Sequence, residues 1–249
     1  MSILGIDLIK MFNLVRGLTS FIADYLQLRK QVKDDKFKVS FYPILDDKYK
    51  QGGTAKGHYF HQDLLVARKV YKANPKRHLD VGSRVDGFIA HLATFRKVII
   101  IDIRELESNV ENIEFIQADM MNIKEDLVES CDSISCLHAL EHFGLGRYGD
   151  PLDIDGHLKG FENIYHMLAP KGIFYFSVPI GPQRIEFNAH RVFSIEYLLE
   201  MFQAKFEISS FSFVDDKGGL NLDVELTDKM VVDNCNCHFG CGIFELNKI

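Results

Sequence analysis

The sequence lacks several features that mark particular classes of protein. Only six of its 249 residues are proline and no low-complexity tract is visible, which argues against long disordered linkers. No basic block is present, and 35 acidic against 29 basic side chains give a net charge of -6, so the chain has no overall attraction to nucleic acid. At 47% hydrophobic and 26% charged, the composition is that of an ordinary soluble globular protein.

Long uninterrupted apolar runs are absent as well. The first 31 residues are rich in apolar side chains, but charges at Asp7, Lys10, Arg16 and Asp24 interrupt them. A spanning helix needs about 20 nearly charge-free residues, and a signal peptide needs an unbroken apolar core. We therefore expect neither, and a cytoplasmic location. Helical apolar spacing over residues 6–25 predicts an amphipathic helix packed on the domain or on a second subunit of a homodimer, with membrane-surface contact as the alternative.

Cysteine is scarce, and the five residues are an odd number. Without a signal peptide this favours a reducing compartment and not a disulfide framework. Cys235, Cys237 and Cys241 form C-x-C-x3-C around His238, a set that could ligate zinc. The spacing matches no usual structural site, so we expect buried reduced thiols, with metal binding by this cluster left open.

Strand and helix signals alternate from residue 76 onward. Strands are predicted over 78–83, 98–103, 113–119, 132–139, 173–181, 206–214 and 242–246, with helices over 87–95, 156–169 and 194–204. We expect an α/β fold with a Rossmann-like, doubly wound seven-stranded sheet, mostly parallel, with an antiparallel C-terminal hairpin at one edge. Residues 58–249 would form this domain and residues 1–57 an N-terminal helical extension.

Acids and a glycine turn stand at the ends of the first three strands. Ligands of parallel sheets bind beyond the carboxyl ends of the strands. Gly82 lets a ligand approach the backbone, Asp102 suits the two hydroxyls of a ribose, and Asp119 suits the exocyclic amine of an adenine. Arg84 and Asp86 break the dinucleotide fingerprint G-x-G-x-x-G. Ordinary turn glycines and helix-capping acids are the alternative interpretation.

The fourth strand runs into the stretch LHALEHFGLG. His138, Glu141 and His142 spell H-x-x-E-H, which on a continuous helix is the zinc-binding motif of inverted metalloproteases. A zinc-dependent hydrolase using His138 and His142 is therefore an alternative. The strand-like SISCL before the motif, and the glycines Gly144 and Gly146 after it, favour a position at the edge of the sheet instead.

Five segments in order resemble the motifs of class I S-adenosylmethionine-dependent methyltransferases over residues 58–249. They are LDVGSRVDGF, VIIIDI, FIQADMMN, SISCLHALEH and LAPKGIFYFSVP. HALEHFGLGRYGDPLDIDG and RIEFNAHRVFS also resemble an uncharacterised bacterial family found among surface-polysaccharide (capsule) biosynthesis proteins. Arg84 and Asp86 replace two glycines of the family's first motif, and Lys171 replaces a glycine before Gly172.

The resemblance implies S-adenosylmethionine as cofactor, S-adenosylhomocysteine as product, and residues 1–57 as a lid over the cofactor. It implies O-methylation of a small polar acceptor, a sugar or nucleotide sugar. A catalytically inactive cofactor-binding module is a further alternative, because the first motif is degenerate. The cofactor-binding residues that it indicates are Tyr59, Gln62, Asp80, Gly82, Ser83, Gly87, Asp102, Ile103, Asp119, Met120 and His138.

Methyl transfer to a hydroxyl needs a base, and histidine is suited to that role. His142 and His190 are the main candidates, and His138 is more a pocket residue. Each could instead be a histidine satisfied structurally by the backbone. The acidic loop over residues 145–160 would form an acceptor lid with Tyr148; a divalent cation held with His138 or His142 is a secondary alternative, and we expect no metal ligands.

Overall fold

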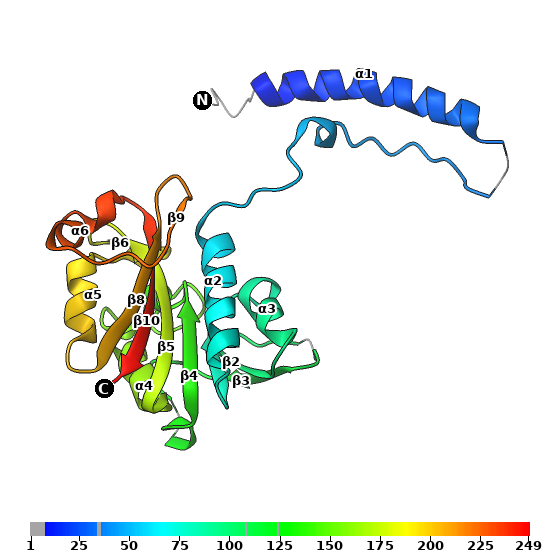
Figure 1. Ribbon diagram of the computed structural model, residues 1–249. Helices are drawn as coiled ribbons and strands as arrows, with labels where there is room; N and C mark the ends of the chain where they lie inside the picture. The colour runs from blue at the N-terminus through cyan, green and yellow to red at the C-terminus, as the bar shows by residue number, and fades with distance from the viewer. Residues whose placement is uncertain (1–7, 34–35, 108, 124) are drawn as a thin grey trace. The chain divides into compact units, whose positions relative to one another are not determined.

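The computed structural model describes residues 8–33, 36–107, 109–123 and 125–249. The chain divides into two compact units, Met1–Thr54 and Ala55–Ile249, which are drawn in Figure 1.

The first unit consists of a long helix and an extended return segment. Helix α1 covers Leu8–Gln31, as its apolar spacing predicts, although Ile6 lies outside the described residues. A 3-10 turn at Asp47–Tyr49 returns to the helix, where Lys48 Nζ lies 2.9 Å from Asp24 Oδ2. No helix in the described part of the chain is long and apolar enough to cross a membrane.

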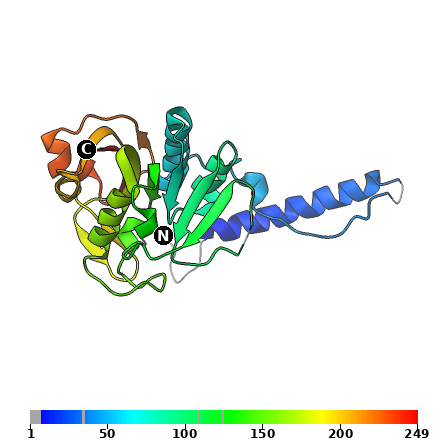
Figure 2. The same cartoon turned by 90° about the horizontal axis from the view of Figure 1, so that it is seen from below.

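The second unit is built on one large sheet, shown from two directions in Figures 1 and 2. Its strand order is β3-β2-β1-β4-β5-β10-β8-β9, with parallel pairing from β3 through β5 and antiparallel pairing from β5 to β9. The strands are β1 (His78–Val81), β2 (Val98–Asp102), β3 (Ile113–Gln117), β4 (Cys131–Leu137), β5 (Leu168–Ile180), β8 (Phe206–Val214), β9 (Leu220–Asn221) and β10 (Gly240–Lys248). A separate hairpin pairs β6 (Arg184–Glu186) with β7 (His190–Val192).

The expected Rossmann-like α/β fold is confirmed, with one difference in detail. In the described part of the chain the sheet has eight strands and not seven, because the two-residue strand β9 pairs with β8. The predicted antiparallel pair is formed by β8 and β10 on one side of the sheet, with β10 between β5 and β8 and antiparallel to both. The apolar residues of β10 explain that position, since Cys241 and Ile243 face one layer of the core while Phe244 and Leu246 face the other.

Helices cover both faces of the sheet. They are α2 (His58–Ala73), α3 (Ala90–Ala93), α4 (Gly156–Met167), α5 (Ile195–Phe202) and α6 (Asp228–Val232). Buried residues of α2 and α3 pack in one core layer, and those of α4 and α5 in the other. The helix expected over 87–95 is shorter than predicted, because a π-helical turn at Val85–Ile89 precedes α3.

Phe161 on α4 is the centre of an aromatic cluster in the core layer that α4 and α5 cover. Its ring centroid lies 5.5 to 6.4 Å from those of four other phenylalanines, Phe174, Phe176, Phe202 and Phe206. Burial of large aromatic side chains and their edge-to-face contacts stabilise this layer.

A buried polar network joins β1 to β4 below the first turn. Asp80 accepts hydrogen bonds from the Ser83 N–H (3.0 Å), the Ser83 hydroxyl (2.8 Å) and the Ser135 hydroxyl. His78 lies between the hydroxyls of Ser133 and Ser135. Burial raises the pKa of Asp80 to about 7, against the opposing hydrogen bonds, and lowers the pKa of His78 to about 3. The network therefore fixes the turn after β1 from beneath.

Replacing Phe161 by alanine should lower the free energy of unfolding by about 3–5 kcal/mol, because a buried ring is lost and a cavity remains. Phe187→Ala is the matched control, since that ring is 75% exposed and its removal should change stability by less than about 0.5 kcal/mol. Urea unfolding of both variants measures the difference, and equal losses would contradict the packing described here.

The raised pKa of Asp80 makes the protein's stability depend on pH. Between the ordinary pKa of 3.8 and about 7 the folded state holds a proton that the unfolded state has released. This contribution is fully present below pH 3.8 and is lost as pH rises through 7, at about 1.4 kcal/mol per pH unit. Asp80→Asn should remove that slope and leave a pH-independent offset.

Urea unfolding of the wild type and Asp80→Asn at several pH values from 5 to 8 tests this. The exposed Asp126→Asn serves as a control and should retain the wild-type slope. Parallel profiles for wild type and Asp80→Asn would show that Asp80 ionises normally in the fold.

Candidate active site

Four parallel strands end at the same edge of the sheet. Gly82 follows β1, Asp102 ends β2, Asp119 lies two residues beyond β3, and His138 follows β4. Gly82 has φ +67°, donates its N–H to the Ile101 carbonyl at 2.9 Å, and leaves no room for a side chain: a Cβ there would lie 2.9 Å from that of Ala139. A glycine is required at this turn because of both the conformation and the close approach.

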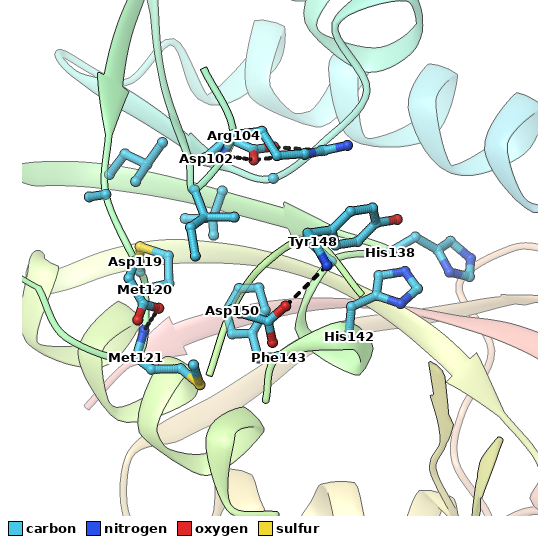
Figure 3. Close-up of a pocket in the computed structure, with 16 residues that line it drawn as sticks. Asp102, Arg104, Asp119, Met120, Met121, His138, His142, Phe143, Tyr148 and Asp150 are labelled. Carbon is cyan, nitrogen blue, oxygen red and sulfur yellow. Dashed lines mark hydrogen bonds and ion pairs between the residues drawn. The ribbon is translucent and has the colours of Figure 1, made fainter. Parts of the chain in front are cut away.

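A cavity opens at this edge and is called the main cavity here (Figure 3). Its walls come from the ends of β1 to β4 and from the loop that follows β4. The lining residues are Val81, Gly82, Ile101, Asp102, Ile103, Arg104, Ala118, Asp119, Met120, Met121, His138, Ala139, His142, Phe143, Tyr148 and Asp150. Six residues predicted from the sequence to bind a cofactor therefore line one space: Gly82, Asp102, Ile103, Asp119, Met120 and His138.

Asp102 and Arg104 form one wall of the main cavity (Figure 3). Asp102 Oδ1 accepts from the N–H and Nε of Arg104 at 2.8 and 3.0 Å, and Oδ2 accepts from Nη2 at 2.7 Å. The Arg104 guanidinium also lies 4.3 Å from the centroid of the Tyr148 ring. A carboxylate can accept about four hydrogen bonds, so Asp102 retains capacity for a ligand hydroxyl.

Asp119 and the two methionines after it form the opposite wall. The Asp119 carboxylate accepts from the Met121 N–H at 2.9 Å, and Asn163 on α4 donates to the Met120 carbonyl at 2.8 Å. These bonds hold the loop in place. Met120 is buried, so the floor of the cavity beside Asp119 is apolar.

A second space adjoins the main cavity and is called the histidine cavity. Its lining residues are His58, Tyr59, Gly82, Arg84, Arg104, Leu137, His138, Glu141, His142, Arg147, Tyr148, Pro179, His190 and Phe239. The two cavities share Gly82, Arg104, His138, His142 and Tyr148. Two ligands, one in each cavity, would therefore meet at His138 and His142.

The Ala189 carbonyl orients the His142 ring. Its Nδ1 lies 2.7 Å from that carbonyl oxygen, which can only accept, so Nδ1 carries a proton. Burial lowers the pKa of His142 below its usual value, which favours the neutral ring. In that form Nε2, which lies 3.8 Å from Glu141 Oε1, is an acceptor. A neutral imidazole with a free Nε2 at the junction of two cavities can remove a proton from a bound ligand.

His138 differs from His142 because it is paired with a buried carboxylate. Its Nδ1 lies 2.7 Å from Glu141 Oε1, and both side chains are almost fully buried. Burial by itself lowers the pKa of His138, but Cys241 and Glu141 raise it well above its usual value. The residue has φ +52°, a strained backbone conformation for a side chain of this size.

His190, at the start of β7, lies on the far side of the histidine cavity. Its Nε2 is 3.3 Å from Glu186 Oε2, and its ring centroid lies 6.4 Å from that of His142 and 5.1 Å from that of Phe239. The next residue, Arg191, is buried and donates to the carbonyls of Phe143 (2.6 Å) and Ile154 (3.0 Å). Arg191 thus fixes the loop after β4 against β7.

The remaining predicted cofactor residues do not line the main cavity. Tyr59 lines the histidine cavity, with its ring 5.2 Å from that of His138. Gln62 is buried between Asp63 and Ser177, and Asp80 and Ser83 bond to each other beneath the turn. Gly87 abuts Asp63, because a Cβ there would lie 2.8 Å from its Oδ2.

The H-x-x-E-H motif is not on a continuous helix. Strand β4 ends at Leu137, His138 has a left-handed backbone, and a 3-10 turn follows at Leu140–His142. The continuous helix that the zinc-hydrolase alternative requires is therefore absent from residues 131–143. The predicted strand end followed by a short helical turn is present instead.

The acidic loop after β4 uses its carboxylates internally. Asp150 accepts from the N–H groups of Gly144 (2.7 Å), Gly146 (3.2 Å) and Tyr148 (3.2 Å). Asp153 pairs with Lys159 and accepts from the Asp155 N–H at 2.9 Å. These bonds shape the loop and place Tyr148 over both cavities.

The lining residues that were not anticipated from the sequence include Arg104, Phe143 and His58. The spacing Asp-x-Arg at 102 and 104 is a local signal for an ion pair but not for a cavity wall. His58 comes to the site only because α2 begins beside the ends of β4 and β5, as its ring contacts with His138 and Phe239 show.

Solved structures with this fold include several class I methyltransferases. The 1,6-didemethyltoxoflavin-N1-methyltransferase of Burkholderia thailandensis, solved with 1,6-didemethyltoxoflavin and S-adenosylhomocysteine, matches with a TM-score of 0.53 and 14% identity over 100% of this chain and 93% of that one. The N-methyltransferase NodS of Bradyrhizobium japonicum, solved with S-adenosylhomocysteine, matches with a TM-score of 0.50 and 14% identity over 90% of this chain and 97% of that one. The [4+2]-cyclase SpnF matches with a TM-score of 0.54 and 14% identity over 94% of this chain and 95% of that one.

These similarities confirm the fold class predicted from the sequence. No curated protein matches the chain. A family model does match, over residues 89–236, which is more than half of the sequence. The chain therefore belongs to the family described as "Caenorhabditis protein of unknown function, DUF268".

Proposed function

We propose that the protein is an S-adenosylmethionine-dependent methyltransferase. The observation that carries this proposal is the convergence of Gly82, Asp102, Asp119 and Met120 on the main cavity. Asp102 offers acceptor capacity for ribose hydroxyls, Asp119 an acceptor for an exocyclic amine, and Met120 an apolar surface for a purine. The two N-methyltransferase neighbours that were solved with S-adenosylhomocysteine support the choice of cofactor.

The histidine cavity is the proposed acceptor site. Its lining of histidines, arginines and tyrosines is polar, which suits a small polar acceptor such as a sugar or nucleotide sugar hydroxyl. Resemblance to proteins of surface-polysaccharide biosynthesis supports that class of acceptor. Fold alone does not determine the reaction, as the cyclase among the structural neighbours illustrates.

S-adenosylmethionine, when bound, supplies a methyl group on a positive sulfur that leaves as a neutral thioether. The protein must align the acceptor oxygen with that carbon and take up the hydroxyl proton. His142 Nε2 is the proposed proton acceptor, and the contact of Nδ1 with the Ala189 carbonyl supports this choice because it keeps a proton on Nδ1. His190 faces the same cavity and is the second candidate for this role, while the ion-paired His138 shapes the junction.

A zinc hydrolase has less support, because the helix that its motif needs is absent from residues 131–143. A cofactor-binding module without catalysis remains the outcome to expect if binding occurs without turnover.

Titration calorimetry with S-adenosylmethionine and S-adenosylhomocysteine tests the cofactor. We expect micromolar dissociation constants, and at least a tenfold weaker affinity for Asp102→Ala, since hydrogen bonds to a charged group contribute about 1.5–3 kcal/mol. Asp86→Ala is the matched control: Asp86 pairs with Arg84 two residues away, as Asp102 does with Arg104, but lines neither cavity. Absence of binding to either compound would overturn the proposal.

Release of S-adenosylhomocysteine against a panel of sugars and nucleotide sugars tests catalysis. His142→Gln should lower kcat by about 10²–10⁴ with little change in cofactor affinity, because only the proton acceptor is lost. The pKa of His142 is lowered, so wild-type activity should rise with pH below neutrality and be level above it. If His190→Gln lowers kcat more than His142→Gln does, and the activity of His142→Gln still rises with pH below neutrality, His190 is the base.

A further inference from the structure

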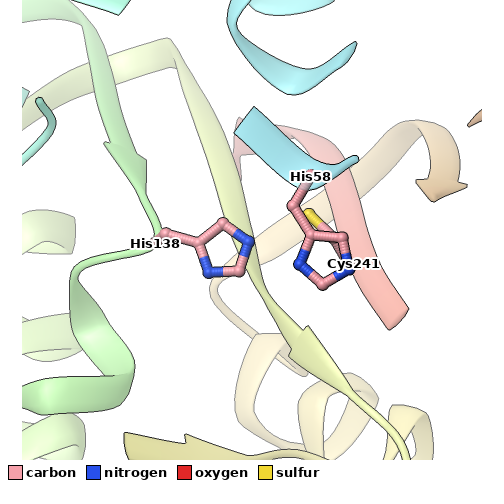
Figure 4. Close-up of side chains that lie close together, drawn as sticks. All are labelled: His58, His138 and Cys241. Atoms are coloured by element: carbon pink, nitrogen blue, oxygen red, sulfur yellow. The ribbon is translucent and has the colours of Figure 1, made fainter. Parts of the chain in front are cut away.

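Three potential metal ligands from distant parts of the sequence gather beside the histidine cavity. Ring nitrogens of His58 and His138 and the Cys241 sulfur all lie within 4.8 Å of one another (Figure 4). His58 begins α2, His138 follows β4, and Cys241 is on β10. His138 is also part of H-x-x-E-H and Cys241 is also part of C-x-C-x3-C, but the group as a whole coincides with neither motif, because it takes His58 in place of the other members.

His138 presents an unsatisfied nitrogen to this group. Its Nδ1 is held by Glu141 at 2.7 Å, but its buried Nε2 has no hydrogen-bond partner, and the side chain is only 5% exposed. A buried polar atom without a partner costs about 1–3 kcal/mol, so such an atom in a native fold calls for a water, an ion or another ligand as its partner. A carboxylate on the other ring nitrogen is also the usual support of a metal-bound histidine.

His58 and Cys241 are the other two potential metal ligands, and both can reach the same point as His138. The His58 ring stacks parallel to that of His138, at 5.2 Å and 7°, and is hydrogen-bonded to the Phe239 backbone. Cys241 is fully buried on the α2 side of the sheet. Its sulfur makes long contacts, 3.7 Å to Gln62 Oε1 and 3.8 Å to the Gly242 carbonyl, and interacts with the His138 ring.

The chemistry of two imidazoles and one thiol selects a borderline-soft transition metal. Zinc takes such ligands at about 2.0–2.1 Å for nitrogen and about 2.3 Å for sulfur, in a tetrahedron whose edges are roughly 3.3–3.7 Å. The ligand atoms lie within 4.8 Å of one another, so a bound ion would bring them about 1 Å nearer. Hard cations such as Mg²⁺ and Ca²⁺ prefer oxygen ligands and do not fit.

We propose that His58, His138 and Cys241 form a Zn²⁺ site with three protein ligands. Zinc sites with three protein ligands keep a fourth position for water or substrate. Here that position faces the histidine cavity, because His58 and His138 line it. Glu141 acts as a positioning residue through His138. The proposal does not depend on the proposed function, since metal binding is measured without cofactor or acceptor.

The test is a titration of the full-length, chelator-treated and dialysed protein with Co²⁺ and then Zn²⁺. We expect one equivalent of Co²⁺, visible d–d absorption typical of tetrahedral cobalt, and a near-ultraviolet thiolate-to-cobalt charge-transfer band, all abolished by one equivalent of Zn²⁺. Cys241→Ser should lose the charge-transfer band. Glu141→Gln should keep the band but bind about 10–100-fold more weakly, as expected for the support of a ligand.

Cys237→Ser is the matched control, because Cys237 is a buried thiol four residues from Cys241 that lies outside the ligand group. Its cobalt spectrum should equal that of the wild type. His58→Ala, a change at the partly exposed start of α2, serves if Cys241→Ser fails to fold, and should abolish stoichiometric binding. No stoichiometric binding to the wild type, an unchanged band in Cys241→Ser, or loss of the band in Cys237→Ser would overturn the site.

Discussion

Parallel pairing of β1 with β2 and β4, and of β2 with β3, is the constraint on which the rest of the site depends. It brings Gly82, Asp102, Asp119 and His138 to one edge, although 56 positions separate the first from the last. The close approach of Gly82 to Ala139 and the buried bonds of Asp80 to Ser83 and Ser135 fix that edge from within. Both cavities open where these strands end.

The two histidines of H-x-x-E-H have different environments despite their spacing. Glu141 contacts both, but it pairs with His138 at 2.7 Å and lies 3.8 Å from His142 Nε2. His142 is instead oriented by the Ala189 carbonyl, which comes from the turn between β6 and β7. These different partners are the basis for proposing His138 as a metal ligand or junction residue and His142 as the proton acceptor.

The sequence predicted the fold and one wall of the site because those features have local signals. Alternating strand and helix patterns gave the parallel sheet, and the acids that end β2 and β3 could be located in the sequence. The interior position of β10 could not, because its pairing with β5 is long-range and no local pattern specifies it. For the same reason the proximity of Cys241 to His58 and His138 was not anticipated. Burial of Asp80 and Gln62 away from the cavity depends on packing across elements, which spacing does not reveal.

The proposed role of the main cavity is to bind the adenine and ribose of S-adenosylmethionine. A crystal structure of the protein grown with S-adenosylhomocysteine tests it most directly. We expect the ribose hydroxyls on Asp102, the adenine beside Asp119 and Met120, and the sulfur directed toward His142. Density for the ligand elsewhere, or an unchanged Asp102–Arg104 pair with the main cavity free of ligand at saturating concentration, would contradict it.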